Sequence, residues 1–403
     1  MTTSPSETQE KVSIRPIRVL HDLHHLTRGG GETWLMNLLR FYRNEEIVFD
    51  FSVCEESYFD AEAKSYGATI HLIPSPYRYF QYLNALRTLL ASGRYDVIHC
   101  HRPSTGGSVL KIAKALSIPC RIVHAHGTWG RGKKTLFNTL RSYHYHWWEK
   151  PLCHRHATSL LATSRETGRL VFGNDFFDTN SRAAVQFCGI DLDPFVCSSE
   201  SGRRDELIKK YSLKSDCIVI GSVGALSIQK NQSFLLRVFR ELVRRDSRYV
   251  LFLVGEGAIR QDLEKEARSL GVADSVVMPG VCTDVPELCC RLFNVFCLPS
   301  TFEPFGLVII EAIAAGLHAV CSNIVTHDIV SRLEPSLSLL DLNAPLSVWA
   351  DALEDGIQRR RAPSEGVEAI RRTPFSIENS AAALENIYRR DVEAAQRRQK
   401  TET

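Results

Sequence analysis

Residues 295–321, VFCLPSTFEPFGLVIIEAIAAGLHAVC, contain a β-rich run, a short turn, an apolar run of helical length and a second β-rich run. The β-rich runs are residues 295–298 and 318–321, and the helical run is 307–315. Glu311 lies inside the apolar stretch, and a carboxylate at the centre of a bilayer is costly. We therefore expect a buried helix followed by a strand rather than a membrane span.

The same alternation of strand and helix extends along the rest of the chain. Further strands are expected at 17–23, 47–54, 69–73, 96–101, 121–125, 159–163, 184–187, 217–223, 249–254 and 275–278. Helices are expected between them at 32–42, 79–91, 105–116, 232–245 and 259–270. Alternation of this kind predicts parallel sheets with helices on both faces.

The stretch 193–204 is rich in Ser, Pro and Gly and is the expected linker between two halves. The prediction is an α/β protein with two doubly wound, Rossmann-like domains facing a central cleft, at 17–195 and 205–375. Residues 1–16 are expected to be a disordered lead-in, and 376–403 a terminal helix. In open α/β sheets ligands bind beyond the carboxyl ends of the strands, so the residues that follow strands are the candidates for a site.

The composition excludes several classes of protein. The chain has 403 residues, 44% of them hydrophobic and 24% charged, with a net charge of +3, which is typical of a globular protein of two domains. Near-balanced charge gives no support for a nucleic-acid partner. Residues 1–16 lack the apolar core of a signal peptide, and the twelve cysteines form no C-x2-C pair. We expect reduced, structural thiols and a cytoplasmic location.

Two groups of residues in the first half follow predicted strands. Arg28-Gly29-Gly30-Gly31-Glu32 opens a helix, where glycines let a ligand approach the backbone and the helix start favours an anion, although such glycines also occur in plain turns. His99-Cys-His101 and His124-Ala-His126 could each chelate a metal, but no carboxylate or cysteine completes a site at suitable spacing. We expect no metal site. His126 is expected to reach the cleft, with His99 and His124 as core histidines.

Two more groups lie in the second half. Lys230 ends the loop Gly224-Ala-Leu-Ser-Ile-Gln-Lys-Asn231 and suits a phosphate, although it could also be a solvated loop lysine. Glu303 and Glu311 are eight residues apart across a strand exit and a helix start. The peptide N–H groups of residues 305–307 (Phe305, Gly306 and Leu307) would be unpaired there and ready for an anion. A ribose diol would satisfy the buried Glu311; the alternative is a capping Glu303 and a lone core Glu311.

These groups, in this order, resemble the retaining glycosyltransferases of family 4, which have the GT-B fold. Glu303 and Glu311 fit the E-x7-E element of that family, and the loop ending at Lys230 and Asn231 is similar to its diphosphate loop. The Gly-Gly-x-Glu turn and Arg121-Ile-Val-His-Ala-His126 resemble the branch that builds exopolysaccharide and capsule. The resemblance covers residues 17–388.

The resemblance implies roles for these residues. Lys230 and the amides of Phe305, Gly306 and Leu307 would hold the diphosphate of a UDP- or GDP-sugar, and Gly29 and Gly30 would lie against it. Glu303 would bind hydroxyls of the sugar, Glu311 the ribose, and His126 the sugar near the reacting centre. Catalysis would rest on His126, Glu303 and Lys230, with no metal and no cofactor other than the nucleotide-sugar co-substrate. The terminal helix would cross back to the N-terminal domain.

The resemblance has one important exception. The arginine that the family places in the diphosphate loop is Ala225 here, which removes a bidentate clamp on the leaving group. Either another base, such as Arg28 or Arg131, replaces it, or activity is weak or lost. The alternatives to an active transferase are therefore a catalytically degenerate scaffold subunit and, from the shared fold, a nucleotide-sugar epimerase.

Residues 121–160 combine basic and aromatic side chains. They hold seven Lys or Arg against one acid, Glu149. The interleaved aromatic residues are Trp129, Phe137, Tyr143, Tyr145, Trp147 and Trp148. This pattern favours contact with an anionic membrane and suits a glycan or polyprenyl-diphosphate-linked acceptor at the inner membrane face; the alternative is an ordinary solvated helix with its aromatics packed inward.

Overall fold

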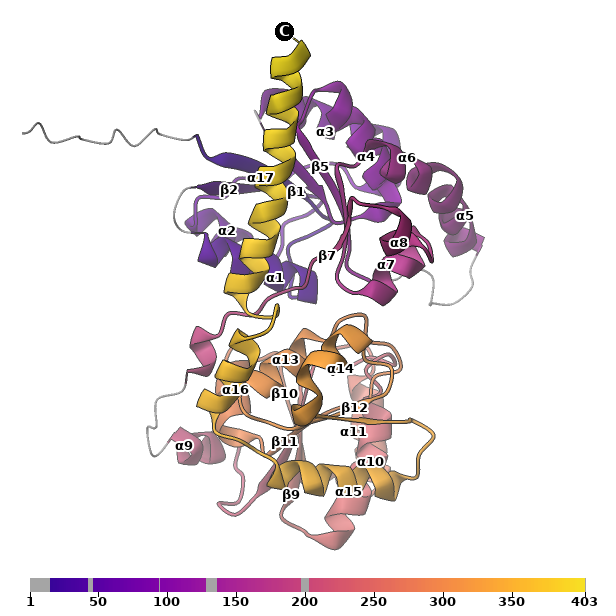
Figure 1. Ribbon diagram of the computed structural model, residues 1–403. Coiled ribbons are helices and arrows are strands. Elements are labelled where there is room, and N and C mark those ends of the chain that lie inside the picture. The colour runs from indigo at the N-terminus through magenta and orange to yellow at the C-terminus, as the bar shows by residue number, and fades with distance from the viewer. Residues whose placement is uncertain (1–14, 43–45, 94, 128–135, 197–202, 403) are drawn as a thin grey trace, which may run out of the picture.

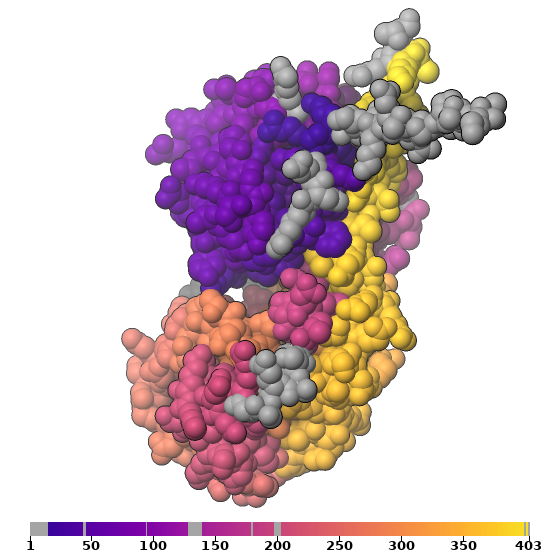
Figure 2. All heavy atoms as spheres, turned by 90° about the vertical axis from the view of Figure 1, so that its left-hand side faces the viewer, coloured from indigo at the N-terminus to yellow at the C-terminus, as the bar shows by residue number. Residues whose placement is uncertain are grey.

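The computed structural model describes residues 15–42, 46–93, 95–127, 136–196 and 203–402. They form two α/β domains, one above the other in Figure 1, and a long terminal helix along the first domain. Figure 2 shows the two lobes meeting at a narrower waist. Residues 1–14 of the expected lead-in and 197–202 of the expected linker lie outside the described residues.

The first domain contains a parallel sheet in the order β3-β2-β1-β4-β5-β6-β7. Its strands are β1 Ile17–Asp22, β2 Ile47–Val53, β3 Ile70–Leu72, β4 Val97–Cys100, β5 Cys120–Ala125, β6 Ser159–Ala162 and β7 Ala183–Val185. Its helices of four or more residues are α1 Gly30–Phe41, α2 Asp60–Ser65, α3 Tyr79–Ser92, α4 Pro103–Ala115, α5 Leu136–His144, α6 Lys150–His156, α7 Arg165–Phe172 and α8 Phe176–Thr179. The inner strands β1, β4, β5 and β6 are almost entirely buried because helices cover both faces.

The second domain repeats this plan with the sheet order β10-β9-β8-β11-β12-β13. Its strands are β8 Ile218–Val223, β9 Tyr249–Val254, β10 Val276–Gly280, β11 Val295–Leu298, β12 Ala319–Ser322 and β13 Leu337–Leu340. Its helices are α9 Arg203–Lys210, α10 Gln232–Arg245, α11 Arg260–Ser269, α12 Val285–Glu287, α13 Leu307–Ala314, α14 His327–Leu333, α15 Leu346–Gln358 and α16 Pro363–Arg371. In both sheets the order reverses beside the first strand of the domain, which creates the crevice that binds ligands in doubly wound folds.

Helix α17, Ile377–Glu402, follows the second domain but packs on the first (Figure 1). The indole Nε1 of Trp34 in α1 donates to Ser380 Oγ at 2.9 Å, and Tyr42 OH donates to the carbonyl of Ala381 at 2.7 Å. Tyr388 is fully buried, and its hydroxyl is 2.7 Å from His99 Nδ1 in the core of the first domain. Buried hydrogen bonds therefore hold α17 on the first domain.

The predicted fold class is confirmed: there are two Rossmann-like domains with parallel sheets. Each predicted strand coincides with an observed strand to within two residues at either end. The prediction missed β13, because this strand has only four residues and lies at the sheet edge after a proline-containing turn. The domain limits at 195, 205 and 375 stay predictions. Among the described helices, none is long and apolar enough to cross a membrane.

Candidate active site

Lys230 and Glu303 meet at the carboxyl edge of the second sheet. Strands β8 and β11 are neighbours, so the loops that follow them lie side by side. Lys230 Nζ is 2.6 Å from Glu303 Oε2, and the two side chains are only 18% and 7% exposed. Two of the predicted site residues therefore form one largely buried ion pair, with Ser300 Oγ as a further donor to Glu303 at 3.4 Å.

Backbone contacts fix the position of this pair. The N–H of Thr301 donates to the carbonyl of Gln229 at 2.8 Å, and the Asn231 amide donates to the carbonyl of Pro299 at 3.1 Å. Asn231 has a φ of 59°, a left-handed conformation that asparagine tolerates better than most residues. The loop that carries Lys230 is thereby joined to the loop that carries Glu303.

The start of the diphosphate-type loop packs closely on the next loop of the domain. Gly224 has a φ of 147°, and a Cβ on Gly255 would lie only 2.1 Å from the carbonyl oxygen of Gly224. Glycine is therefore required where these two loops cross. Ala225 is exposed beside this crossing, so its small side chain leaves space above the loop.

Helix α13 begins at the predicted anion site. Gly306, its N-cap, has a φ of 85°, and a Cβ there would lie 2.9 Å from Ile309 Cδ1. Within the described residues the N–H groups of Phe305, Gly306 and Leu307 have no hydrogen-bond acceptor. These are unpaired donors at the positive end of a helix dipole, as the sequence predicts. The ring of Phe305 packs against Phe375 of the segment that leads to α17.

Glu311 lies at the start of the second turn of α13. Its carboxylate has no hydrogen-bond or ion-pair partner among the residues that the structure describes. The side chain keeps some surface, but the dense surrounding protein removes water from the carboxyl group. This burial raises the pKa of Glu311 to about 7. An unpartnered carboxyl of this kind needs an external hydrogen-bond donor, or a proton, to be stable.

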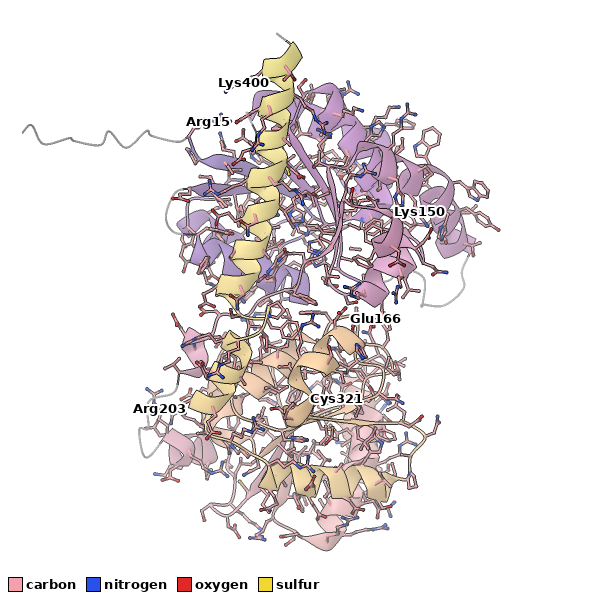
Figure 3. All side chains as sticks on the ribbon, viewed as in Figure 1. Arg15, Lys150, Glu166, Arg203, Cys321 and Lys400 are labelled. Carbon is pink, nitrogen blue, oxygen red and sulfur yellow. The ribbon has the colours of Figure 1, made fainter. Side chains whose placement is uncertain are left out.

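The glycine turn of the first domain lies opposite the start of α13. A Cβ on Gly30 would be 3.5 Å from Leu307 Cδ1, and a Cβ on Gly127 would be 3.6 Å from Pro304 Cγ. A Cβ on Gly29 would collide with the carboxylate of Glu32, which folds back over the turn. The sequence-predicted residues of both domains are thus brought together at the domain boundary, where Glu166 of α7 also bonds to Thr326 (Figure 3).

His126 extends from β5 to the same boundary. Its Nε2 is 2.7 Å from Nδ1 of His101, whereas its buried Nδ1 has no partner in the described part of the chain. Burial lowers the pKa of His126 to about 4, so the ring is neutral at ordinary pH. His99 has the partners expected of a core histidine, Tyr388 and His124, while His124 has a partner at Nδ1 alone.

The structure brings one more histidine to this cluster than the sequence predicts. His21 of β1 joins both H-x-H pairs, because β1, β4 and β5 are adjacent in the sheet. The ligand atoms of His21, His99 and His101 lie within 4.8 Å of one another, as do those of His101, His124 and His126. The expected absence of a metal site stays a prediction. His21 lies one residue before the end of β1 and pairs beside His99, and the sheet order that brings the two together is not contained in the local sequence pattern.

Arg28 and Arg131 are the bases that the sequence offers in place of the arginine missing at position 225. Arg28 bonds to Tyr58 OH and stacks on the Tyr58 ring with 4.0 Å to its centre. Arg131 lies outside the described residues. Neither is therefore placed on the Lys230 loop by the structure.

The basic, aromatic segment at residues 121–160 contains both buried and exposed side chains. Arg121 donates to the carbonyls of Ile118 and His156, and Glu149, the one acid, is fully buried among Ser108 and Tyr79. The guanidinium of Arg121 therefore binds backbone carbonyls within the first domain. Trp129, Lys133 and Lys134, and the side chain of Phe137, lie outside what the structure describes.

The outer aromatic residues form an exposed surface. Tyr143, Trp147 and Trp148 are 61%, 78% and 57% exposed, and Phe80 of α3 is 85% exposed. Phe80 and Trp148 line one groove together with Arg87 and Lys111. We call Phe80, Tyr143, Trp147 and Trp148 the aromatic surface; Tyr145 alone of the described aromatics in this segment packs inward. Lys150 lies on the same outer side of the domain (Figure 3).

Comparison with known families gives the site its context. Residues 28–194 match the model of Glycosyltransferase Family 4, and residues 203–328 match that of Glycosyl transferases group 1. The chain belongs to glycosyltransferase family 4. The first match lies in the first domain and the second match in the second domain, and together they contain every predicted site residue.

The chain is similar over most of its length to other bacterial glycosyltransferases. It is 29% identical over 380 residues to the putative glycosyltransferase EpsF of Bacillus subtilis, covering 92% of this chain and 96% of the relative. It is 25% identical over 353 residues to the UDP-Gal:alpha-D-GlcNAc-diphosphoundecaprenol alpha-1,3-galactosyltransferase of Escherichia coli, covering 83% and 86%. The likeness covers nearly the whole of both relatives.

Solved structures confirm the GT-B fold of the glycosyltransferase. HepE of Anabaena, solved in complex with UDP-glucose, superposes with a TM-score of 0.71 at 17% identity, covering 94% of this chain and 99% of HepE. WaaG, a glycosyltransferase involved in lipopolysaccharide biosynthesis, gives a TM-score of 0.64 at 17% identity, covering 94% and 98%. At this identity the likeness concerns the fold.

Proposed function

We propose that this chain is a retaining, metal-independent glycosyltransferase of surface polysaccharide synthesis. It would move a hexose or related sugar from a UDP- or GDP-sugar to a lipid-linked or oligosaccharide acceptor. The observation that carries the proposal is the joint placement of Lys230, Glu303 and the unpaired N–H groups at the start of α13, with Glu311 unpartnered behind them. The similarity to a galactosyltransferase that is named for a diphosphoundecaprenol-linked acceptor supports a lipid-linked acceptor.

The leaving group decides the electrostatics of the reaction. Breaking the sugar–phosphate bond builds negative charge on the diphosphate, which Lys230 and the N–H groups of residues 305–307 would stabilise. The ammonium of Lys230 already pairs with the carboxylate of Glu303, so a bound phosphate would share the positive charge of Lys230 with Glu303. Because these donors supply the positive charge, the proposal needs no resident metal. Gly29 and Gly30 would lie against the phosphates from the opposite domain.

The remaining residues would hold the sugar and the nucleoside. Glu303 would accept hydrogen bonds from sugar hydroxyls, Glu311 would accept them from the ribose diol, and His126 would contact the sugar beside the anomeric carbon. Transfer with retention would follow attack from the face that the leaving group vacates. In that step the C1–O bond to phosphate breaks, the acceptor oxygen bonds to C1, and the acceptor proton passes to the leaving phosphate. Closure of the two domains would exclude water.

The acceptor would be reached from a membrane surface. Exposed aromatic rings beside lysine and arginine are typical of a protein that lies on anionic lipid, and the aromatic surface supplies two tryptophans, a tyrosine and a phenylalanine. We propose peripheral attachment through this surface at the inner membrane face, where a polyprenyl-diphosphate-linked acceptor would be presented. A nucleic-acid partner is not part of the proposal.

A donor screen with stereochemical analysis tests the proposal. UDP- and GDP-sugars would be incubated with the chain, and the anomeric configuration of product formed early in the reaction would be read by proton NMR. The proposal predicts turnover with at least one donor and product of the donor's own configuration. An inverted product would contradict retention, and the same turnover after Lys230→Met would contradict the site.

Ala225 favours a second candidate function. Without the family arginine the chain could be a degenerate GT-B subunit that keeps the fold for binding and does not turn over. Clear turnover by the isolated wild-type chain in the same screen would exclude it. Interconversion of the donor sugar without any acceptor would instead indicate an epimerase.

A further inference from the structure

The first domain has a groove at its end away from the second domain. The groove has a volume of about 760 Å³ and lies between α17 and the turns that precede β5, β6 and β7. Figure 3 shows Lys400, in the last turn of α17, at this end of the molecule. Arg121, which lines the groove, and His126 of the candidate active site lie at opposite ends of β5, about 17 Å apart. The groove is therefore separate from that site.

Basic side chains dominate the lining of this groove. Asp391 is the one acid among the described residues that line it, and Asp391 is already paired with Arg390 at 2.8 Å. The same carboxylate accepts a hydrogen bond from Ser159 Oγ at 2.8 Å. The charge of Asp391 is thus used by its own neighbours on α17. The cations that remain without an ion pair in the described part of the chain are Lys114, Arg121, Arg155, Arg182 and Arg398.

Arg121 and Arg182 are held in place by uncharged groups. Arg121 Nε donates to the carbonyl of His156 at 2.9 Å, and Arg182 Nη2 donates to the carbonyl of His154 at 2.8 Å. Both arginines are partly buried. A carbonyl satisfies an N–H group but carries no net charge, so each guanidinium keeps its full positive charge in a fixed position.

The other three unpaired cations are exposed. The side chains of Lys114, Arg155 and Arg398 have no hydrogen-bond partner within the described ranges. Lys114 and Arg155 lie in the last turns of α4 and α6, where the helix dipole favours a cation but supplies only about half a negative charge. Burial lowers the pKa of Arg121, and the nearby charge of Arg398 lowers it further. The folded chain therefore gathers like charges that only an added anion would neutralise.

We infer that this groove is a binding site for a small, multiply charged phosphate compound. Arginine binds phosphate oxygens through two parallel N–H groups, and five arginines line the groove. One phosphate group carries about two negative charges, so the five unpaired cations fit several linked phosphates. An anion in the groove would contact both α17 and the first sheet and would hold the helix on the domain. The site is independent of the proposed transfer reaction.

The lining favours a soluble anion over a lipid headgroup. Membrane-binding surfaces present aromatic or large aliphatic side chains beside their cations. The apolar residues of this groove are small or buried, and none is aromatic; they are Ile118, Pro119, Ala157, Ala394 and Ala395. The aromatic surface, by contrast, lies on α3 and on residues 143–148.

Isothermal titration of inorganic tripolyphosphate into the full chain tests the inference. The double variant Arg155→Gln, Arg398→Gln removes two cations that hold no other side chain, and it should lower the affinity at least tenfold. The matched control is Lys265→Gln, Arg268→Gln, at exposed positions of α11 in the second domain, because it changes the net charge equally. The control should bind as the wild type does. Equal affinity of the two double variants, or no binding to the wild type, would overturn the inference.

The proposed diphosphate site beside Lys230 is a second place where this probe could bind. Lys230→Met should keep the binding that Arg155→Gln, Arg398→Gln loses. Binding that Lys230→Met abolishes and the groove variant retains would place the probe between the domains and overturn the inference. Because tripolyphosphate contains neither nucleoside nor sugar, the result does not depend on whether the chain transfers a sugar.

Anionic vesicles distinguish the two sources of phosphate. Vesicles of phosphatidylglycerol would be sedimented with Arg155→Gln, Arg398→Gln and with the control Lys265→Gln, Arg268→Gln. The inference predicts the same vesicle binding by both. Loss of vesicle binding in the groove variant, with no binding of tripolyphosphate to the wild type, would assign the groove to lipid headgroups and overturn the inference.

Discussion

The ionisation of Glu311 is expected to make the affinity for the donor depend on pH. Its pKa of about 7 lies above the usual carboxyl value because the folded protein desolvates it. The ribose diol would donate to the ionised form, so donor affinity should rise as the pH increases through 7. Glu311→Gln should weaken binding about 10- to 100-fold at pH 8, the loss of hydrogen bonds to a charged group, and should remove the pH dependence. Isothermal titration between pH 5.5 and 8.5 measures both effects.

The same shift has a consequence for stability. The unfolded chain loses the Glu311 proton near the ordinary pKa of 4.5, whereas the folded chain keeps it to about pH 7. The free energy of unfolding should therefore fall between these two values, by more in the wild type than in Glu311→Gln, and the difference should be constant above pH 7. Denaturant unfolding of both proteins across this range tests the sign. A larger fall in the Gln variant would contradict the desolvated carboxyl.

Ala225 offers a gain of function. Because it is exposed beside the crossing of the Gly224 and Gly255 loops, a longer side chain fits without repacking. Ala225→Arg should add a bidentate contact to the diphosphate and strengthen donor binding about tenfold. Ala225→Met, which adds bulk without charge, is the matched control. Equal affinity of the Arg and Met variants would show that the diphosphate does not lie over this loop.

Gly306 at the start of α13 is expected to tolerate no side chain. Gly306→Ala places a Cβ at a φ of 85° and within 2.9 Å of Ile309 Cδ1. Gly67→Ala is a matched control, because Gly67 has a φ of 88° and nothing within 4 Å of the added Cβ. The control should lose about 1 kcal/mol of stability from backbone strain, and Gly306→Ala should lose more and also weaken donor binding. Chemical denaturation and titration of the donor distinguish the two.

The elements themselves show what the sequence could and could not predict. Strand and helix alternate with clear periods in stretches such as 218–223 and 232–245, so local pattern was enough to find them. The Lys230–Glu303 pair depends on β8 and β11 being neighbours, and the sheet order is a long-range property that no local pattern contains. The contacts between His21, His101 and His126 depend likewise on which strands lie beside β4, so the two H-x-H motifs could be found from sequence and His21 could not.

At the scale of the whole molecule, the first domain is expected to bind lipid. The double variant Trp147→Ser, Trp148→Ser removes two exposed rings of the aromatic surface and should lower binding to vesicles of anionic phospholipid at least tenfold. Leu72→Ser, at an exposed site on the far edge of the same sheet, is the control. Sedimentation with vesicles measures binding. Equal binding of wild type and the double variant would exclude this surface.

The proposed role of Lys230 is to neutralise the diphosphate of a nucleotide-sugar between the two domains. Its most direct test is isothermal titration of the donor found in the screen into wild type and Lys230→Met, which keeps the stem of the side chain and removes the charge. Lys230→Met should weaken binding by about tenfold or more, because a charge-assisted contact is lost while the fold is retained. Equal affinity of the wild type and a folded Lys230→Met protein would contradict this role of Lys230.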